Sequence, residues 1–203
     1  MAEDVLANWQ EIPKRNNIVF TSRFDKEKNP YFMLEVAREF LEKHPDYTWT
    51  ITTSGKEIRS SMPNIIHDLR NFSRENSRFI IKEGLTKEEY YYELASSKIL
   101  FNSSLQDYVS WTVIEGTTFG IELCFPNFRS FPEFIPKDRM YHPFDVGDAI
   151  RLLGVVLNDL RTHEYIPYLS NLGRLTEKYV IENDITQELN IWHESEYIKS
   201  LIR

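Results

Sequence analysis

Two pairs of charged residues each follow an apolar, strand-like run of the chain. Arg23 and Lys28 form the first pair, and Asp107 and Glu115 form the second. In a parallel α/β sheet, the loops that follow the strands are where a ligand binds. Guanidinium and ammonium groups hold phosphate oxygens, and carboxylates accept hydrogen bonds from sugar hydroxyls. The two pairs therefore suit a ligand that carries both a diphosphate and a sugar.

The segments that would position these residues alternate between strand and helix patterns. Strands are expected at about 17–22, 47–53, 78–82, 98–102 and 121–125. Helices are expected at about 30–44, 86–95, 111–119 and 145–160, and residues 55–76 are expected to form a loop with one or two helical turns. This alternation predicts an α/β fold, with a Rossmann-like parallel sheet and helices on both faces.

Helix start signals support three of these boundaries. Asn29 followed by Pro30 is typical of a helix N-cap and first helical position. Thr86 and Glu89 have the spacing of a capping box, in which each side chain bonds the backbone of the other residue. Asp145 is the expected N-cap of the last helix in the alternating region.

The chain divides by pattern into three parts. Residues 1–16 are expected to be a lead-in segment, and residues 17–160 the Rossmann-like domain. Residues 161–203 contain few helix breakers and are expected to form a helical extension rather than a second domain.

The composition is that of an ordinary globular protein. The chain has 203 residues, of which 41% are hydrophobic and 27% charged, with a net charge of -7. That charge argues against bulk attraction to nucleic acid or anionic membranes. Cys124 is the only cysteine, no apolar run reaches membrane-spanning length, and the amino terminus lacks a secretion signal. A cytoplasmic protein is therefore expected.

Other ligand classes lack their signatures. The sequence contains neither G-x-G-x-x-G nor G-x-x-x-x-G-K-[ST], so the common dinucleotide and P-loop motifs are absent. The five histidines are widely scattered, so no metal site is expected. The run Tyr90-Tyr91-Tyr92 could stack on bases, but packing of these rings is the favoured interpretation.

An irregular basic stretch is the only hint of a polyanionic partner. It consists of Lys56, Arg59, Arg70, Arg74 and Arg78. Acidic residues lie among these cations, so a solvated face is favoured. A nucleic acid or another phosphate-bearing acceptor remains the less favoured alternative.

Four segments, in order, resemble signatures of GT-B glycosyltransferases of the retaining, glycogen-synthase-like kind. Residues 21–30, TSRFDKEKNP, resemble that family's G-R-x-x-x-x-K stretch. Residues 103–116 are similar to its S-x-x-E-x7-E-A signature. Residues 119–123 and 131–135 resemble the strand and the P-E-[IL] segment that follow it.

The resemblance implies a nucleotide-sugar-binding domain and a role for each matching residue. Arg23 and Lys28 would hold the donor diphosphate, Asp107 the donor sugar and Glu115 the ribose, with the base near residues 82–85. Arg23, Lys28 and Asp107 would be the catalytic residues. The implied donor-binding set is Ser22, Arg23, Lys28, Asp107, Ser110, Trp111, Thr112 and Glu115.

The sequence departs from the family pattern at several positions. Asp107 stands where the family has glutamate, the family's E-G-F-G turn has lost its glycines, and Gly116 replaces an alanine. The chain also has no room for the family's amino-terminal acceptor-binding domain, so such a domain or a partner chain is expected.

The expected function is sugar transfer, with retention, from a nucleotide-diphosphate sugar to an unknown acceptor, with no cofactor or metal. A non-catalytic module derived from the same fold is the alternative. A nucleotide-sugar epimerase is less favoured, since no acid/base pair stands out.

Overall fold

The computed structural model describes residue 5 and residues 8–54, 57–107 and 110–158. Its strands are β1 (Arg15–Phe20), β2 (Thr48–Ser54), β3 (Phe79–Leu85), β4 (Ser97–Phe101), β5 (Glu122–Pro126) and β6 (Met140–Tyr141). Its α-helices are α2 (Pro30–Lys43), α3 (Ile65–Glu75), α4 (Lys87–Ser96), α5 (Trp111–Thr118), α6 (Phe131–Phe134) and α7 (Val146–Asn158). Short 3-10 turns are η1 (Trp9–Glu11), η2 (Lys26–Lys28) and η3 (Lys137–Arg139).

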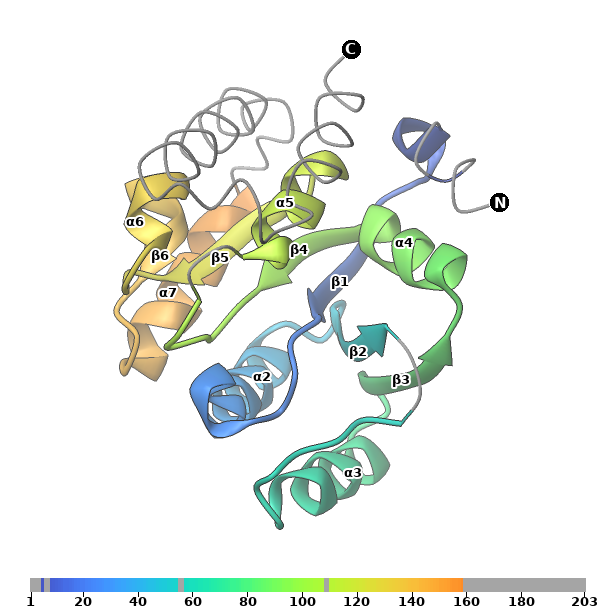
Figure 1. Ribbon diagram of the computed structural model, residues 1–203, viewed down its shortest axis with the longest axis vertical. Coiled ribbons are helices and arrows are strands. Elements are labelled where there is room, and N and C mark those ends of the chain that lie inside the picture. Colours follow the sequence, from blue (N-terminus) through green and yellow to red (C-terminus); the bar gives the residue numbers. More distant parts are fainter. Residues whose placement is uncertain (1–4, 6–7, 55–56, 108–109, 159–203) are drawn as a thin grey trace, which may run out of the picture. The chain divides into compact units, whose positions relative to one another are not determined.

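The six strands form a parallel sheet in the order β3-β2-β1-β4-β5-β6 (Figure 1). The predicted Rossmann-like α/β fold is therefore confirmed. The chain runs outward in one direction from β1 to β3 and in the other from β4 to β6. The chain that leaves β1 and the chain that leaves β4 lead to helices on opposite faces of the sheet, and such a switch point is where open parallel sheets bind ligands.

Helices cover both faces of this sheet, as predicted. Helix α2 packs between α3 and α7 on one face, while α4 and α5 lie on the other (Figure 1). The side chains of β1 alternate accordingly: Ile18 and Phe20 join the cluster under α2, and Val19, also buried, points to the opposite side.

Each expected helix start is present, but the caps differ in chemistry. Thr86 and Glu89 form the complete capping box at the start of α4. The Asp145 carboxylate accepts a hydrogen bond from the Asp148 N–H in the first turn of α7, 2.9 Å away. Asn29 precedes Pro30 as expected, yet it has a left-handed backbone (φ 48°) and no side-chain cap bond.

The expectation for residues 55–76 was wrong, because α3 spans Ile65–Glu75 and so makes three turns. Ile65, Leu69 and Phe72 have helical spacing and are buried against the core. The polar residues between them and Pro63 before them obscured this stripe. The helical extension expected at 161–203 lies outside the described residues.

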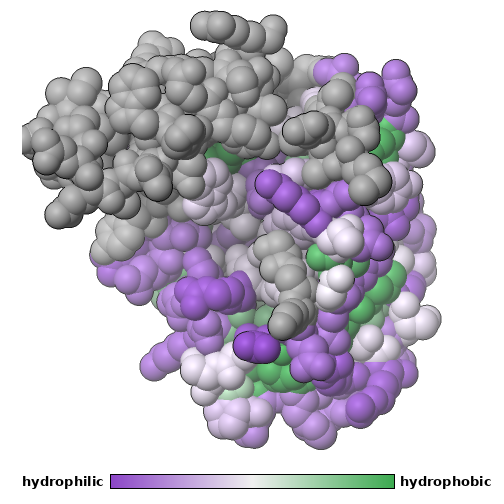
Figure 2. All heavy atoms as spheres, turned by 45° about the vertical axis from the view of Figure 1, so that its right-hand side comes forward, coloured by the Kyte–Doolittle hydropathy of each residue, from purple (hydrophilic) through white to green (hydrophobic). Residues whose placement is uncertain are grey.

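On the face shown in Figure 2, hydrophilic side chains predominate, and hydrophobic ones appear between them in small patches. No helix of the described part of the chain is long and apolar enough to cross a membrane.

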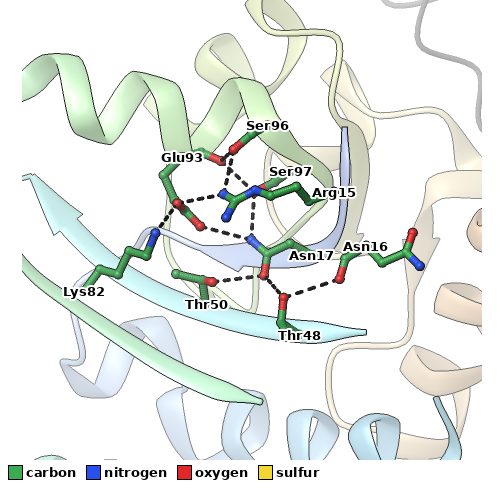
Figure 3. A network of polar contacts seen from close by, with 9 residues as sticks. All are labelled: Arg15, Asn16, Asn17, Thr48, Thr50, Lys82, Glu93, Ser96 and Ser97. Carbon is green, nitrogen blue, oxygen red and sulfur yellow. Dashed lines mark hydrogen bonds and ion pairs between the residues drawn. The ribbon is translucent and has the colours of Figure 1, made fainter. Parts of the chain in front are cut away.

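A buried carboxylate ties α4 to the sheet (Figure 3). Glu93 is 2% exposed, and its Oε2 accepts bonds from Arg15 (2.8 Å) and Lys82 (2.6 Å). Its Oε1 accepts a bond from the Asn17 amide at 3.2 Å. Burial alone would raise the pKa of Glu93, but these cations lower it below the ordinary value.

The Asn17 side chain carries the same network across the sheet (Figure 3). Its amide oxygen accepts bonds from the hydroxyls of Thr48 and Thr50, on β2, and its nitrogen also donates to Ser97. Since every polar atom of Asn17 is paired, this buried amide is compatible with a stable core. The network joins α4 to the strands β1, β2, β3 and β4.

Replacing Glu93 by alanine should destabilise the fold by about 3 kcal/mol, because Asn17 and two cations lose a buried partner. The lowered pKa adds a pH signature. The stabilisation is present above the ordinary carboxyl pKa and is lost as the pH falls through the lowered folded value. Denaturant unfolding between pH 3 and 7 should therefore show a weaker acid dependence in Glu93→Ala. Glu75→Ala, at an exposed position of α3, is the control. Equal losses in both variants would contradict this account.

Candidate functional site

The loops that follow β1 and β4 meet at the switch point of the sheet. The Leu105 N–H donates to the Glu27 carbonyl at 2.7 Å. The Ser103 hydroxyl donates to the Lys28 carbonyl at 2.7 Å. These bonds fix the relative position of two loops that are distant in sequence, and both loops carry predicted site residues.

Lys28 and Asp107 form an ion pair across these loops. The Lys28 Nζ lies 3.0 Å from Asp107 Oδ2, and the two side chains are 11% and 21% exposed. The same ammonium lies 3.4 Å from the Gln106 carbonyl oxygen. Partial burial limits solvent screening, so this contact is stronger than a surface pair. The structure thus joins one cation and one carboxylate of the predicted site.

Arg23 binds carboxylates of its own loop instead. Its guanidinium lies 3.0 Å from Asp25 and 2.8 Å from Glu27, and the side chain is 68% exposed. It lines a cavity of about 480 Å³ together with Arg59 and Ser61 of the β2–α3 connection. Ser22, beside Arg23, is buried. The two predicted cations, Arg23 and Lys28, therefore contact different carboxylates.

Helix α5 begins at Trp111, and the three predicted residues Ser110, Trp111 and Thr112 lie at its amino end. Ser110 occupies the N-cap position, but its hydroxyl lies 2.7 Å from that of Thr112 and makes no cap bond to the backbone. Thr112 also accepts a bond from the Asn102 amide at 3.1 Å. Trp111 is 47% exposed. A helix end of this kind presents backbone N–H groups that favour an anion.

Glu115 lies one turn further along α5 and contacts α4. The Tyr90 hydroxyl donates to Glu115 Oε2 at 2.8 Å. Burial raises the pKa of Glu115 to about 7, although the Tyr90 hydrogen bond and the nearby charge of Lys87 oppose the rise. Burial and the Glu115 charge raise the pKa of Tyr90 well above its usual value, so the phenol keeps its proton and acts as the donor.

Gly116 brings α5 close to the sheet. A Cβ at this position would lie 2.6 Å from Leu123 Cδ2 and 2.7 Å from Leu100 Cδ2. Such distances are too short for carbon atoms, so a residue with a side chain would force these buried groups to shift.

Other predicted features are accounted for by packing. Tyr90 and Tyr91 are buried while Tyr92 is exposed, and Cys124 is a buried thiol. Lys82, expected near a base, binds Glu93. Among the described residues, no group of His, Cys, Asp or Glu side chains could hold a metal ion.

Sequence reasoning missed Tyr90, Asn102 and Ser103 as parts of the site. The capping box at Thr86 does fix the start of α4, and therefore which face of that helix Tyr90 occupies. Its contact with Glu115 depends on the packing of α4 against α5, which leaves no local signal.

No family model matches the sequence. A curated relative is the tRNA-queuosine alpha-mannosyltransferase of Drosophila melanogaster, which is 23% identical over 127 residues. The match covers 62% of this chain and 32% of that protein, so the chain spans about a third of the length of this relative.

Solved structures of glycosyltransferases share the fold. The carboxy-terminal domain of LpcC from Francisella tularensis has a TM-score of 0.63 at 17% identity, with 86% of this chain and 92% of that domain covered. The glycosyltransferase from Rickettsia africae has a TM-score of 0.64 at 15% identity, covering 93% and 52%. Pneumococcal GtfA, solved with UDP and GlcNAc, has a TM-score of 0.62 at 14% identity, covering 93% and 37%. The described part of this chain therefore has the fold of a GT-B glycosyltransferase domain.

Proposed function

We propose that this chain is the donor-binding domain of a glycosyltransferase and takes a UDP- or GDP-linked sugar. The observation that carries the proposal is the contact between Lys28 and Asp107 at the switch point of the sheet. The contact brings together an ammonium, which can bind phosphate oxygens, and a carboxylate, which can accept hydrogen bonds from sugar hydroxyls. The amino end of α5, with Ser110, Trp111 and Thr112, adds backbone N–H groups for the diphosphate.

Binding of the donor would replace contacts that the side chains of this site make with one another. A diphosphate oxygen would replace the Asp107 carboxylate on Lys28, and the freed Asp107 would accept a bond from a sugar hydroxyl. Arg23 would leave Asp25 or Glu27 to reach the diphosphate, and its exposure permits that movement. Glu115 would bind the ribose. Ser22 has a small side chain, which would let the loop after β1 lie close to the donor.

Transfer to an acceptor requires surfaces beyond this domain. Relatives of which the chain spans a third to a half are glycosyltransferases, so an amino-terminal acceptor-binding domain or a partner chain fits the proposal. Retention of the anomeric configuration rests on the resemblance of residues 103–116 to the signature of retaining enzymes.

Removing the Lys28 ammonium tests the proposal. A hydrogen bond to a charged group contributes about 1.5–3 kcal/mol, so Lys28→Ala should weaken UDP or GDP binding about 10- to 100-fold in calorimetric titrations. Arg23→Ala should lose less, because that guanidinium must first leave two carboxylates, whereas Lys28 leaves one. Lys43→Ala, at an exposed ion pair on α2, is the control and should bind like the wild type. Failure of the wild type to bind either nucleotide at millimolar concentration would refute the proposal.

The raised pKa of Glu115 predicts opposite effects of one substitution on stability and on binding. Its pKa rises from an ordinary 4.5 to about 7, so the folded state favours the neutral carboxyl and loses stability as the pH rises through this interval. Glu115→Gln should therefore be more stable than the wild type at pH 8, by about 1–3 kcal/mol, and about equally stable near pH 4. The same variant should bind UDP or GDP more weakly, because the amide is a poorer acceptor for ribose hydroxyls.

Chemical unfolding at the two pH values measures this effect. Glu42→Gln, at an exposed position of α2, should change neither stability nor binding. A Glu115→Gln protein less stable than the wild type at pH 8 would show that the carboxylate stabilises the fold, against this prediction.

A further inference from the structure

The Tyr90 side chain reaches the proposed ribose-binding carboxylate from a neighbouring helix. Tyr90 is 5% exposed, and its hydroxyl lies 2.8 Å from Glu115 Oε2. Its ring also packs against Tyr91, which in turn contacts Phe119 at the end of α5. Both the ring and the hydroxyl of Tyr90 are therefore fixed, so the hydroxyl can hold the carboxylate in one orientation.

The position of Tyr90 itself depends on the buried network of α4. Glu93 lies three residues further along the helix, so Tyr90 and Glu93 are neighbours on the helix surface. Glu93 is anchored to β1 and β3 by Arg15 and Lys82. Helix α4 is thereby prevented from rotating or sliding along the sheet, and the Tyr90 hydroxyl stays within reach of Glu115.

The hydrogen bond occupies one oxygen of Glu115 and leaves the other for a ligand. Among the described residues, none donates a hydrogen bond to Glu115 Oε1. Tyr90 and Lys87, both on α4, are the titratable groups that act on this carboxylate within the described part of the chain. A carboxylate held at one oxygen presents the second in a fixed direction, which suits a single hydroxyl of a ribose diol.

We propose that Tyr90 is a positioning residue that makes the site selective for ribose by holding Glu115 in the orientation that accepts a ribose hydroxyl. This inference rests on the proposed nucleotide-sugar function. Tyr90 does not touch the ligand. It acts through Glu115 by orienting the carboxylate and by favouring its ionised form. Loss of the hydroxyl would raise the pKa of Glu115 further, since the Tyr90 hydrogen bond lowers it.

Tyr90→Phe in the full chain tests the inference, with Tyr92→Phe as the matched control two residues away at an exposed position. Three probes are titrated into each protein between pH 6 and 9: UDP or GDP, the 2′-deoxy form of the same nucleotide, and inorganic pyrophosphate. The expected result is an affinity for the ribonucleotide about tenfold lower in Tyr90→Phe at pH 7, corresponding to one hydrogen bond of about 1.4 kcal/mol. The loss should be smaller for the deoxynucleotide and absent for pyrophosphate.

The pH profile separates positioning from general damage to the fold. The midpoint for ribonucleotide binding should lie at higher pH in Tyr90→Phe than in the wild type or in Tyr92→Phe. In a Glu115→Gln background, Tyr90→Phe should have little further effect, because the group it positions has lost its charge. If Tyr90→Phe does not fold, 3-fluorotyrosine placed at residue 90 replaces it: this more acidic phenol keeps the ring shape and should move the midpoint to lower pH.

The outcomes distinguish this inference from the proposed function. A wild type that binds neither nucleotide nor pyrophosphate overturns the proposed function and the inference with it. A wild type that binds the ribonucleotide, with equal affinity in Tyr90→Phe, overturns the inference alone. Equal losses for ribonucleotide, deoxynucleotide and pyrophosphate also overturn it, because they indicate a purely structural role.

Discussion

The geometry of this domain depends on the hydrogen bonds and ion pairs of the buried Glu93 carboxylate. This side chain is 2% exposed, and it accepts hydrogen bonds from Arg15 and Asn17 of β1 and from Lys82 of β3. Isolated charges in a protein interior are costly, whereas a charge with this many partners is tolerated and fixes its surroundings. Helix α4 is the element fixed in this way. The same helix then presents Tyr90 to Glu115, so a network within the fold determines the orientation of a group in the site.

The other half of the site depends on contacts between loops. The backbone bond from Leu105 to Glu27 and the Ser103 hydroxyl bond to the Lys28 carbonyl hold the two switch-point loops together. Lys28 and Asp107 meet because of these bonds. Their ion pair compensates both of these partly buried charges. In the proposed function, the donor diphosphate would replace this carboxylate on Lys28.

Much of the fold could be predicted from local signals in the sequence. The Thr86 and Glu89 capping box marks the start of α4, because capping chemistry depends on residues close in sequence. Pro30 marks the start of α2, although Asn29 makes no cap bond. Helix α3 was underestimated, since its apolar stripe is short and is interrupted by polar residues. The alternation predicted five of the six strands and their parallel arrangement, because parallel strands follow from helices placed between them. It missed β6, which is only two residues long.

The site was predictable only in part, because some of its contacts join residues that are distant in sequence. That Lys28 and Asp107 lie near each other follows from the topology, in which the loops after β1 and β4 leave neighbouring strands. Arg23 binds carboxylates two and four residues away, and the acidic character of its loop was visible in the sequence. The pairing of Tyr90 with Glu115 was not predictable, because it arises from the packing of α4 beside α5.

Gly116 lies on the buried side of α5, where it determines how closely the helix packs on the sheet. Its missing methyl group lets α5 rest directly on Leu100 and Leu123, and Glu115 is the adjacent residue. A bulkier residue there would have to lift the helix from the sheet or displace both leucines. The distance between α5 and the sheet is therefore set by a residue on the buried side of the helix, which faces away from its predicted binding residues.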